Sequence, residues 1–483
     1  MIDLTALFEP RGVIVAGASA HPGKFGFVAL HNILRNHYGG QVFAVNRDGG
    51  EILGQTALTT VSDVPHGAAD LLFACTPAAA NLAVIREAAA RGVRVAFVTS
   101  GGYGEADEAG RAAERELVSV ARELGMVLAG PNGQGVVSTP ASLCAQIVAP
   151  YPPRGHIGIA SQSGNFVSSL QNYAVQTGIG VSRAVSAGNA AALSVPDLLE
   201  WYAHDPETKV GLAYVEGVAD GRGFYDQLRH CTLQTPVVVL KGGATAGGQR
   251  AAASHTGALA TDDRVFDGMC HQAGITRAPT LEAAFEAAAT FATQPLPRGP
   301  RVAVLTTAGG WGVVAADAVV RSGLELVALP DDLRAALDAK LPPRWSRNNP
   351  IDLAGGETRD TIPEVMELVA SHDAVDAVVY LGLGIQSNQA RLMKTGAFYP
   401  DHGLDRIVAY HERQDDRFAR AAAQASDATG KPILTATELA VADPENPGPA
   451  AVRATGRLCY ASADRAVTAL AHAWRYARWR VTR

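Results

Sequence analysis

Residues 12–19 read GVIVAGAS, a short run of apolar and β-branched residues that ends in glycine, alanine and serine. Such a run is typical of a strand that is buried on both faces of a parallel sheet. The pattern returns in QVFAVN (41–46), DLLFACTP (70–77), VRVAFVTSGG (93–102) and MVLAGPN (126–132). An amphipathic helix is predicted over residues 105–124. We therefore expect a doubly wound α/β domain that closes near residue 145.

This α/β pattern is repeated twice more, each time after a proline-rich segment. The two segments are VAPYPPRG (148–155) and TQPLPRGP (293–300), and a new apolar run follows each of them. In the last part of the chain, strands are predicted at 301–310, 374–384, 405–412 and 431–437. The sequence therefore predicts three α/β domains, with the bounds 1–148, 149–296 and 297–483.

One kind of turn recurs in all three predicted domains. VTSGGYGE (98–105), IASQSGNF (159–166) and LTTAGGWG (305–312) each lead from a strand through small hydroxyl residues and glycines to a helix. The first N–H groups of a helix bind anions, although glycine is also expected at any strand-to-helix turn of an α/β domain. Three such turns in one chain favour a protein that handles phosphate groups.

The composition excludes several classes of partner. The 483 residues are 47% hydrophobic and 18% charged, and a formal net charge of −6 gives no general attraction to nucleic acid or anionic lipid. No apolar run reaches the roughly 18 residues of a membrane span, and no signal peptide is recognisable at the N-terminus. Five scattered cysteines without a CxxC pair predict neither a metal site nor disulfides. We expect a cytoplasmic protein without a membrane or nucleic-acid partner.

The most informative segment is KGGATAGGQRAAASHTGALA (241–260), in which His255 lies among small residues. Imidazole is a nucleophile at neutral pH, and a covalent phosphohistidine divides a difficult phosphoryl transfer into two easier displacements. Small neighbours leave room for a charged phosphoryl group. His255 is therefore a candidate phosphoryl carrier, with a plain surface or capping histidine as the alternative.

Two further features belong with this histidine. Glu216 ends the apolar run LAYVEGV, and a carboxylate at the end of a parallel strand faces the ligand crevice, where it can orient an imidazole. The alternative is an exposed acid in a turn. The segment SQSGN (161–165) lies at a predicted helix start, where N–H groups and hydroxyls can hold a phosphoryl group, or where it is a simple N-cap.

The loop GASAHPGKFG (17–26) follows the first strand but does not match GxGxxG, so NAD is disfavoured. Lys24 in this loop suits a phosphate group. The strand ends at Asn46, Thr76–Pro77 and 100–102 are expected to line the same crevice.

Taken in chain order, these motifs resemble a known family. They are GASAHPGKFG, AVN (44–46), TPA (76–78), GPN (130–132), SQSG (161–164), GN (188–189), DLLEWYAHDPETK (197–209), YVEGV (214–218), VVLKGG (238–243), AAASHTGALA (251–260), TTAGGWGVVAADA (306–318) and NPIDLAGG (349–356). The chain resembles the ADP-forming acyl-CoA synthetases, also called ADP-forming acetate–CoA ligases, which are relatives of succinyl-CoA synthetase. The resemblance implies a Rossmann-like CoA-binding domain followed by two flavodoxin-like CoA-ligase domains.

The resemblance also implies roles for individual residues. Acyl-CoA and phosphate would give an acyl-phosphate, which would phosphorylate His255, and Glu216 would orient that histidine. Phosphate groups would be held by Ser161, Gln162, Ser163, Gly164 and Asn165, and in the third domain by Gly309, Gly310 and Gly312. CoA would be held by Gly17, Ala18, Ser19, Lys24, Gly26, Val45, Asn46, Thr76, Pro77, Ser100, Gly101 and Asn132.

The family needs an ATP-grasp module for its nucleotide, and the sequence leaves no stretch of about 200 residues to form one. The resemblance therefore implies that ADP or ATP and Mg²⁺ bind on a partner subunit of the β type, in an α2β2 assembly. Several positions depart from the family pattern, namely Gly133, Trp311, the stretch 190–195, Asn165 and Phe166. They put acetate in doubt as the substrate. A CoA-binding or acyl-CoA-binding protein, or an acyltransfer component without nucleotide-dependent ligase activity, stays open as an alternative.

Overall fold

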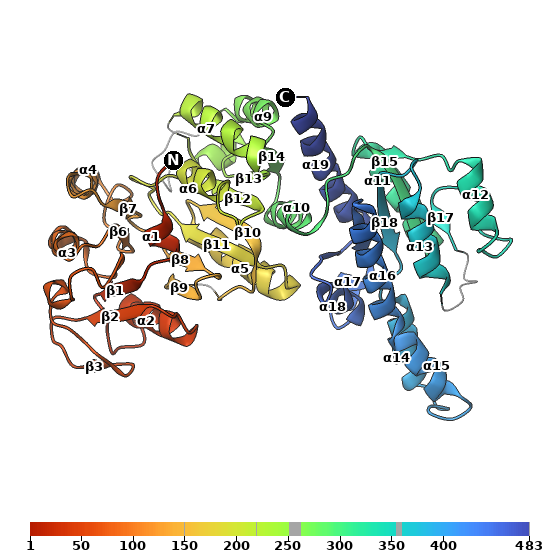
Figure 1. Ribbon diagram of the computed structural model, residues 1–483, viewed down its shortest axis with the longest axis horizontal. Helices are drawn as coiled ribbons and strands as arrows, with labels where there is room; N and C mark the ends of the chain where they lie inside the picture. The colour runs from red at the N-terminus through yellow and green to blue at the C-terminus, as the bar shows by residue number, and fades with distance from the viewer. Residues whose placement is uncertain (149, 219, 251–261, 354–359, 483) are drawn as a thin grey trace. The chain divides into compact units, whose positions relative to one another are not determined.

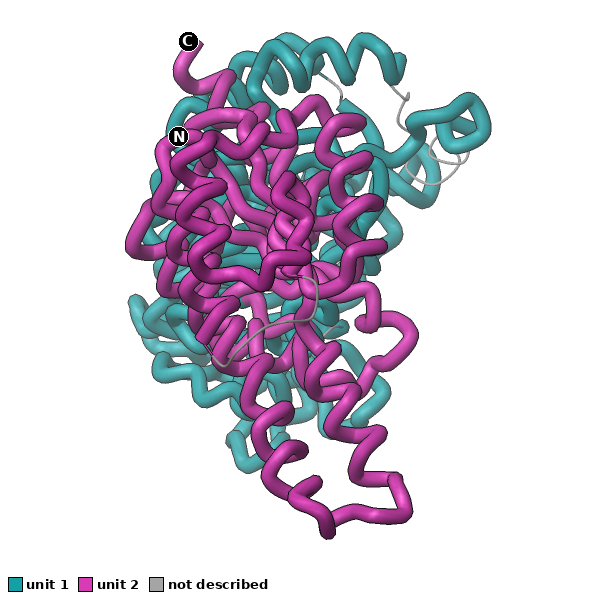
Figure 2. The backbone as a smooth tube through the Cα atoms, turned by 90° about the vertical axis from the view of Figure 1, so that its right-hand side faces the viewer, with its two compact units in different colours: residues 1–176, 180–284 teal, residues 177–179, 285–483 magenta. Residues whose placement is uncertain are grey.

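The computed structural model describes residues 1–148, 150–218, 220–250, 262–353 and 360–482. These residues form two compact units, one of residues 1–176 and 180–284 and the other of residues 177–179 and 285–483 (Figure 2). Unit 1 contains two large sheets and unit 2 one, and the sheets are mainly parallel and covered by helices (Figure 1). None of the helices within the described ranges is long and apolar enough to span a membrane.

The first sheet of unit 1 has five parallel strands in the order β2-β1-β5-β6-β7. They are β2 (Gln41–Val45), β1 (Gly12–Ala16), β5 (Leu71–Ala74), β6 (Val95–Val98) and β7 (Val127–Ala129). Around them lie α1 (Thr5–Phe8), α2 (Phe25–Arg35), the hairpin β3 (Glu51–Ile52) with β4 (Gln55–Thr56), η1 (Val61–Asp63), α3 (Ala78–Ala90) and α4 (Glu108–Glu123).

The side chains of β1 alternate between the two faces of this sheet, which explains why helices cover both faces. Val13 and Val15 share a buried cluster with Ile33 of α2, whereas Ile14 shares another with Ile85 of α3. Successive side chains of a strand point to opposite faces, so an all-apolar strand needs apolar cover on both. The strand order reverses between β1 and β5, and ligands bind at the carboxyl ends of strands at such a point.

The second sheet of unit 1 has seven strands in the order β14-β13-β12-β10-β11-β8-β9. Its parallel strands are β10 (Arg154–Ser161), β11 (Val181–Ser186), β12 (Val210–Val215), β13 (Val237–Lys241) and β14 (Thr276–Ala278). The helices α5 (Gly164–Thr177), α6 (Val195–Tyr202), α7 (Gly221–Gln234) and α9 (Asp263–Ala273) accompany them.

Two strands that lie within the residues predicted for the first domain belong to this second sheet. The hairpin of β8 (Gly135–Ser138) and β9 (Leu143–Gln146) pairs antiparallel with β11. An unpaired edge of β11 would expose a row of backbone N–H and C=O groups, and the hairpin covers it. The first sheet therefore ends with β7, while the predicted closure of the first domain near residue 145 and the division into three domains stay predictions.

A buried arginine joins the first residues of the chain to the second sheet. Only 1% of the Arg183 side chain is exposed, and its guanidinium donates hydrogen bonds to Asp205 (3.0 Å), to Glu9 (2.6 Å) and to the Ser138 hydroxyl. It also lies 5.4 Å from the centre of the Trp201 ring. Because removal of Arg183 would leave Asp205 buried without a cation, loss of this arginine would destabilise unit 1.

Unit 2 contains a third sheet in the order β16-β15-β18-β19-β20, with β17 also paired to β15. The strands are β15 (Arg301–Thr306), β16 (Glu325–Leu326), β17 (Ile351–Asp352), β18 (Ala377–Leu381), β19 (Ile433–Ala436) and β20 (Cys459–Tyr460). The helices are α11 (Gly309–Arg321), α12 (Asp331–Asp338), α13 (Thr361–Ser371), α14 (Ile385–Lys394), α15 (Leu404–Glu412), α16 (Gln414–Thr429), α17 (Leu439–Ala442), α18 (Pro447–Arg453) and α19 (Ala463–Val481). Helix α10 (Leu281–Thr293) contains the boundary between the units.

One predicted strand of unit 2 is a helix. Residues 405–412 lie within α15, which packs side by side with α14 as a helical hairpin (Figures 1 and 2). The prediction of a strand at this place is wrong. The run DRIVAYHE has a short apolar stretch, and so short a stretch does not distinguish a strand from a helix by its periodicity.

Candidate functional site

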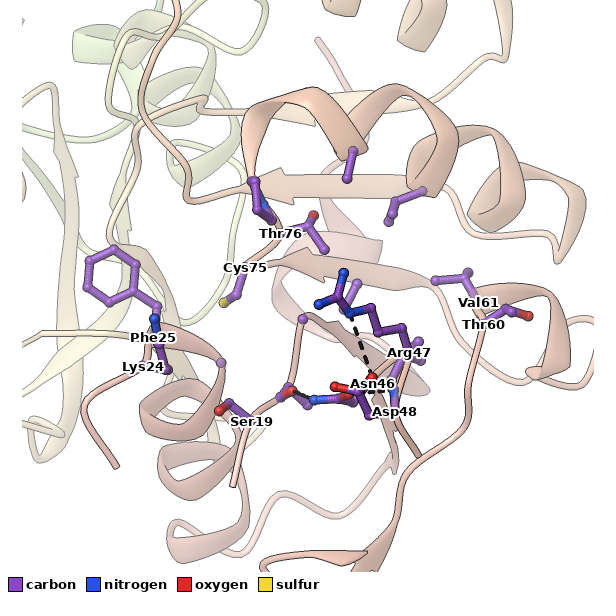
Figure 3. Close-up of a pocket in the computed structure, with 18 of the residues that line it drawn as sticks. Ser19, Lys24, Phe25, Asn46, Arg47, Asp48, Thr60, Val61, Cys75 and Thr76 are labelled. Carbon is purple, nitrogen blue, oxygen red and sulfur yellow. Dashed lines mark hydrogen bonds and ion pairs between the residues drawn. The ribbon is translucent and has the colours of Figure 1, made fainter. Parts of the chain in front are cut away.

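The largest site of unit 1 that we describe is a cavity of about 860 Å³ at the carboxyl ends of β1, β2 and β5. It lies where the strand order reverses. Nine of the twelve residues predicted to hold CoA line it, namely Gly17, Ala18, Ser19, Lys24, Gly26, Val45, Asn46, Thr76 and Pro77. Figure 3 shows Ser19 and Asn46 on one side of it and Thr76 on the other.

Close backbone contacts shape the loop that borders this cavity. Gly17 has φ +78°, a conformation that favours glycine, and a Cβ on Gly26 would lie 2.0 Å from the Gly17 carbonyl oxygen. The Asn46 side chain donates a hydrogen bond to the Ala18 carbonyl at 2.7 Å, which ties the loop to the end of β2. Lys24 then stands immediately before α2, next to the positive end of that helix. The loop therefore offers an anion a lysine and a helix N-terminus.

The sequence did not identify the rest of the lining. Arg47 and Asp48 follow Asn46 directly, and their side chains form an ion pair of 3.7 Å (Figure 3). Ala80, Val84 and Glu87 lie on one face of α3. Their spacing of four and three residues was a signal for a shared helix face, but the sequence did not show that this face borders the cavity.

The lining also contains one cysteine, Cys75. Burial raises the pKa of its thiol to about 12, so the thiol is neutral at pH 7. A cavity of this size, with the apolar side chains Ala80 and Val84, hydroxyls and the cations Lys24 and Arg47, fits CoA, which has an adenosine and several phosphate groups.

Three residues predicted to hold CoA lie outside this cavity. Ser100 accepts a hydrogen bond from the Asn81 side chain at 2.8 Å, and Gly101 follows it in the loop after β6. The main chain of Asn132 donates to the Ser100 carbonyl at 3.0 Å, and its side chain donates to Asn189 at 3.3 Å. These residues therefore lie between the first and second sheets. In this loop β6 ends at Val98 and α4 begins only at Glu108, so no helix starts directly at the turn.

The turn at 161–165 does lead straight into a helix. The Ser161 hydroxyl accepts the main-chain N–H of Ser163 at 3.0 Å and donates to the Ser163 carbonyl at 2.7 Å. Helix α5 begins at Gly164, where a Cβ would lie 1.9 Å from the Gln134 side chain, and Asn165 is exposed at its first turn. The first N–H groups of a helix have no intrahelical partner, so this turn can hold an anion.

Glu216 lies beside this turn. The residue is only 7% exposed, so the alternative of an exposed turn acid is wrong. Its Oε1 accepts a hydrogen bond from the Tyr214 hydroxyl at 3.1 Å, and its N–H donates to Oε1 of Gln162 at 2.7 Å. Burial first, and then the Glu216 charge, raise the pKa of Tyr214, so the phenol is a neutral donor. The structure therefore brings Glu216 and the turn together.

His255 lies outside the described residues, but the chain on either side of it is described. The preceding strand β13 is the neighbour of β12 in the sheet, and a Cβ on Gly242 would lie 3.4 Å from Cγ of Glu216. Lys241 donates to the Gly242 and Gly243 carbonyls at 3.2 Å, and its Nζ lies 3.7 Å from Asp263 at the start of α9. The segment that carries His255 therefore begins next to Glu216.

The three glycines predicted to bind phosphate in the third domain lie at the start of α11 in unit 2. Ala308 donates its N–H to the Thr306 hydroxyl at 2.9 Å, which repeats the geometry of Ser161. A Cβ on Gly309 would lie 2.5 Å from Asp352 and one on Gly312 3.0 Å from Thr306, whereas Gly310 has open space. Across the described parts of the chain, no group of three or more His, Cys, Asp or Glu residues is placed to hold a metal ion.

Comparison with known proteins agrees with this arrangement. Three family models match in order: the CoA binding domain at residues 11–139, the succinyl-CoA ligase like flavodoxin domain at 154–291 and the Ligase-CoA domain at 302–384. The chain is 38% identical over 358 residues to acetate–CoA ligase [ADP-forming] I subunit alpha of Pyrococcus furiosus, covering 73% of this chain and 77% of that one. It is 32% identical over 386 residues to a trans-feruloyl-CoA synthase from an unknown prokaryotic organism, covering 78% of this chain and 54% of the other.

A solved structure has the same fold over the whole length. It is the dinucleotide forming acetyl-coenzyme A synthetase 1 of Ca. Korarchaeum cryptofilum in complex with phosphate and ADP, with a TM-score of 0.85 and 31% identity. The match covers 100% of this chain and 98% of that one. The order of domains, the cavity of the first sheet and these similarities agree, and the chain belongs to the family of ADP-forming acyl-CoA ligases, in the part that two-subunit members name subunit alpha.

Proposed function

We propose that this chain is the CoA-binding, phosphohistidine-carrying subunit of an acyl-CoA ligase that interconverts acyl-CoA, phosphate and ADP with the carboxylic acid, CoA and ATP. The observation that supports it most strongly is the buried Glu216 beside the Ser161 turn, at the point where the segment with His255 begins. The turn suits a phosphate group and the carboxylate suits an imidazole.

The reaction follows in three displacements. An oxygen of inorganic phosphate attacks the thioester carbonyl, the thiolate leaves as CoA and the acyl-phosphate forms. A nitrogen of His255 attacks the phosphorus, and the carboxylate of the acid leaves. A terminal oxygen of ADP then attacks the phosphohistidine, which breaks the N–P bond and gives ATP. The helix start at Ser161–Asn165 stabilises the charge on phosphorus, and Glu216 stabilises the imidazole while it carries positive charge.

We place CoA in the cavity of the first sheet. Lys24 and Arg47 supply positive charge for its phosphate groups, and the face of α3 supplies apolar contact. Ser100, Gly101 and Asn132 lie between the first and second sheets, which is where the thioester end has to arrive to meet phosphate at Ser161. The three-domain division at 148 and 296 fits this separation of roles.

Nucleotide and Mg²⁺ are placed on a partner subunit of the ATP-grasp type, in an α2β2 assembly. The naming of the Pyrococcus relative as subunit alpha supports a second subunit. Gly309, Gly310 and Gly312 form a second phosphate-binding turn in this proposal. The free state of all five cysteines supports a reducing cytoplasm.

The acid need not be acetate. Phe166 stands in the first turn of α5, stacked on Tyr214 with ring centres 3.8 Å apart, beside the proposed phosphate site. One relative is named as a trans-feruloyl-CoA synthase, which acts on an aromatic acid. We infer that a bulkier or aromatic acid is accepted.

The test is phosphate labelling of the purified chain. Radiolabelled inorganic phosphate is added with acetyl-CoA or feruloyl-CoA, and we expect an acid-labile label on the protein with at least one thioester. His255→Ala removes the label, whereas His204→Ala, at an exposed histidine outside the proposed site, keeps it. Absence of label on the wild-type chain with both thioesters, and also with ATP and a co-purified partner, would refute the proposed function.

A further inference from the structure

Tyr214 occupies an unusual place in the second sheet, because it joins Glu216 to the first turn of α5. It lies in β12, two residues before Glu216, so both side chains leave the chain on the same face of the sheet. Its hydroxyl donates to Oε1 of Glu216 at 3.1 Å. Its ring is stacked on Phe166 with 14° between the planes.

The tyrosine side chain is held from several directions. It is 8% exposed, and Phe166 covers one face of the ring. A Cβ on Gly242 would lie 2.6 Å from the Tyr214 hydroxyl, so the main chain after β13 passes close to this group. A phenol that is buried and stacked has few orientations, and a hydrogen bond from it to a carboxylate fixes the rotation of that carboxylate.

The main chain of the same residues is fixed through Gln162. The carbonyl of Tyr214 accepts the N–H of Gln162 at 3.2 Å, and Oε1 of Gln162 accepts the N–H of Glu216. The backbone of Glu216 is therefore tied to the turn. The hydrogen bond from the Tyr214 hydroxyl joins two buried groups and limits the side-chain torsions of Glu216.

We propose that Tyr214 is a positioning residue for phosphoryl transfer, which orients the Glu216 carboxylate toward the imidazole that it serves. This inference rests on the proposed function, because it assigns to Tyr214 an effect that acts through Glu216. Phe166 supports the role by holding the ring in place. A tyrosine that only stabilised the fold would lower stability without changing the rate of labelling.

The test compares Tyr214→Phe with Tyr202→Phe in the labelling reaction with inorganic phosphate and acyl-CoA. Both substitutions remove one buried hydroxyl from the same domain, because the Tyr202 hydroxyl donates to the Ile159 carbonyl at 2.9 Å. We expect Tyr214→Phe to slow labelling about tenfold with the KM for acyl-CoA unchanged, the fold-change of one hydrogen bond to a charged group. Tyr202→Phe should label at the wild-type rate.

A double-mutant cycle shows whether Tyr214 acts through Glu216. In a Glu216→Gln background, Tyr214→Phe should lower the labelling rate by less than about twofold further. The charged carboxylate that Tyr214 orients is already absent in that background. Phe166→Leu keeps an apolar side chain without a ring to stack, and about a threefold loss is expected, of the size of one aromatic pair.

Four results would overturn the role of Tyr214. They are labelling of Tyr214→Phe at the wild-type rate, equal slowing by Tyr202→Phe, fully multiplicative losses in the double mutant, and a raised KM in place of a lowered kcat. If the wild-type chain itself takes no label, the proposed function and this role fall together. If the wild type is labelled and Tyr214→Phe is unaffected, only this role falls.

Discussion

The turns at Ser161 and Thr306 have the same backbone geometry and different surroundings. In each, a hydroxyl residue ends a parallel strand, accepts the N–H of the residue two positions later and precedes a helix that begins at a glycine. The next residue also donates to the neighbouring strand in both, from Gln162 to Tyr214 at 3.2 Å and from Thr307 to Leu381 at 3.1 Å. The shared geometry follows from the fold.

The neighbouring strands differ two residues further on. Ser161 is paired with Tyr214, and Glu216 follows that tyrosine, whereas Thr306 is paired with Leu381, and buried Leu383 follows it. A helix start can hold an anion in either unit, and a carboxylate lies beside each: Glu216 in unit 1, and in unit 2 Asp352 of β17, which lies 2.5 Å from a Cβ placed on Gly309. Only Glu216 lies next to the main chain that leads to His255, where a carboxylate can orient and charge-stabilise an imidazole. The comparison therefore separates anion binding, which the fold provides twice, from the chemistry, which depends on one side chain.

Replacement of Glu216 by glutamine tests most directly whether the chemistry depends on this carboxylate and not on anion binding by the helix start alone. The amide has the same shape and removes only the charge, so phosphate labelling of the chain should fall by about 1,000-fold while the fold is kept. Glu207→Gln is the matched control, because Glu207 forms an ion pair with Arg154 on the surface of the same domain. If Glu216→Gln is labelled at the wild-type rate, the Glu216 carboxylate does not distinguish the Ser161 turn from the Thr306 turn.

The two units also differ in how their ion pairs are buried. Arg183 of unit 1 has 1% of its side chain exposed, whereas Arg321 of unit 2, which pairs with the exposed Asp464, has 62%. Arg183→Met should lower the free energy of unfolding of unit 1 by about 3 kcal/mol, because it leaves Asp205 buried without its cation. Arg321→Met should lower that of unit 2 by no more than about 1 kcal/mol. Hydrogen exchange of peptides from β11 and β15 measures each unit, and equal losses would contradict this difference.

Unit 2 also contains a buried histidine, His472, whose uncharged form is favoured by burial. Burial, helped by the charge of Arg475, lowers the pKa of His472 to about 4. The unfolded chain takes up a proton near pH 6.5 and folded His472 does not, so stability is full above pH 6.5 and is lost as the pH falls toward 4. By pH 5 the loss is about 2 kcal/mol.

His472→Asn should reduce this pH dependence, since an amide oxygen can still accept the hydrogen bond that Arg475 donates to Nδ1 at 3.0 Å. The measurement is urea unfolding of unit 2 at pH 7.5 and pH 5. Parallel losses of stability in the variant and the wild-type chain would show that His472 is not the cause.

Much of the fold was readable from the sequence because its signals are local. Runs such as GVIVAGAS are buried strands wherever they pair, and the turn at Ser161 was visible as hydroxyl and glycine residues after a strand. The strand predicted at 405–412 is a helix, since packing against α14 decided its state. The sequence did not indicate that the β8–β9 hairpin pairs with β11, because only tertiary structure shows which edge a hairpin covers.

The residues of the candidate site were also predicted only in part. Glu216 and Asn46 were found because they end strands, and strand ends of a parallel sheet meet at one edge. Arg47 and the face of α3 were missed, because a residue beyond the strand end or on a neighbouring helix gives no local sign that it borders a cavity. Tyr214 was hidden in an apolar strand, where its hydroxyl has a partner only once Glu216 is in place.

The smallest expected effect tests the turns themselves. Ser161→Ala and Thr306→Ala each remove a hydroxyl that accepts an N–H and donates to a carbonyl. Each should lower the stability of its own unit by about 1 kcal/mol, the usual cost of losing a capping hydroxyl. Hydrogen exchange of peptides from α5 and α11 measures the two losses separately.

The rate of phosphate labelling of the same two variants then distinguishes the roles of the turns. Only the Ser161 turn contacts Glu216, through Gln162, so Ser161→Ala alone should slow phosphate labelling, by roughly tenfold, whereas Thr306→Ala should leave the rate unchanged. Equal slowing by both would mean that the turn of unit 2 contacts the same phosphoryl group in this step. In that case the two turns would not have different roles. One phosphoryl group would need both helix starts at once, so the unit 2 turn would take part in the chemistry as well as bind an anion.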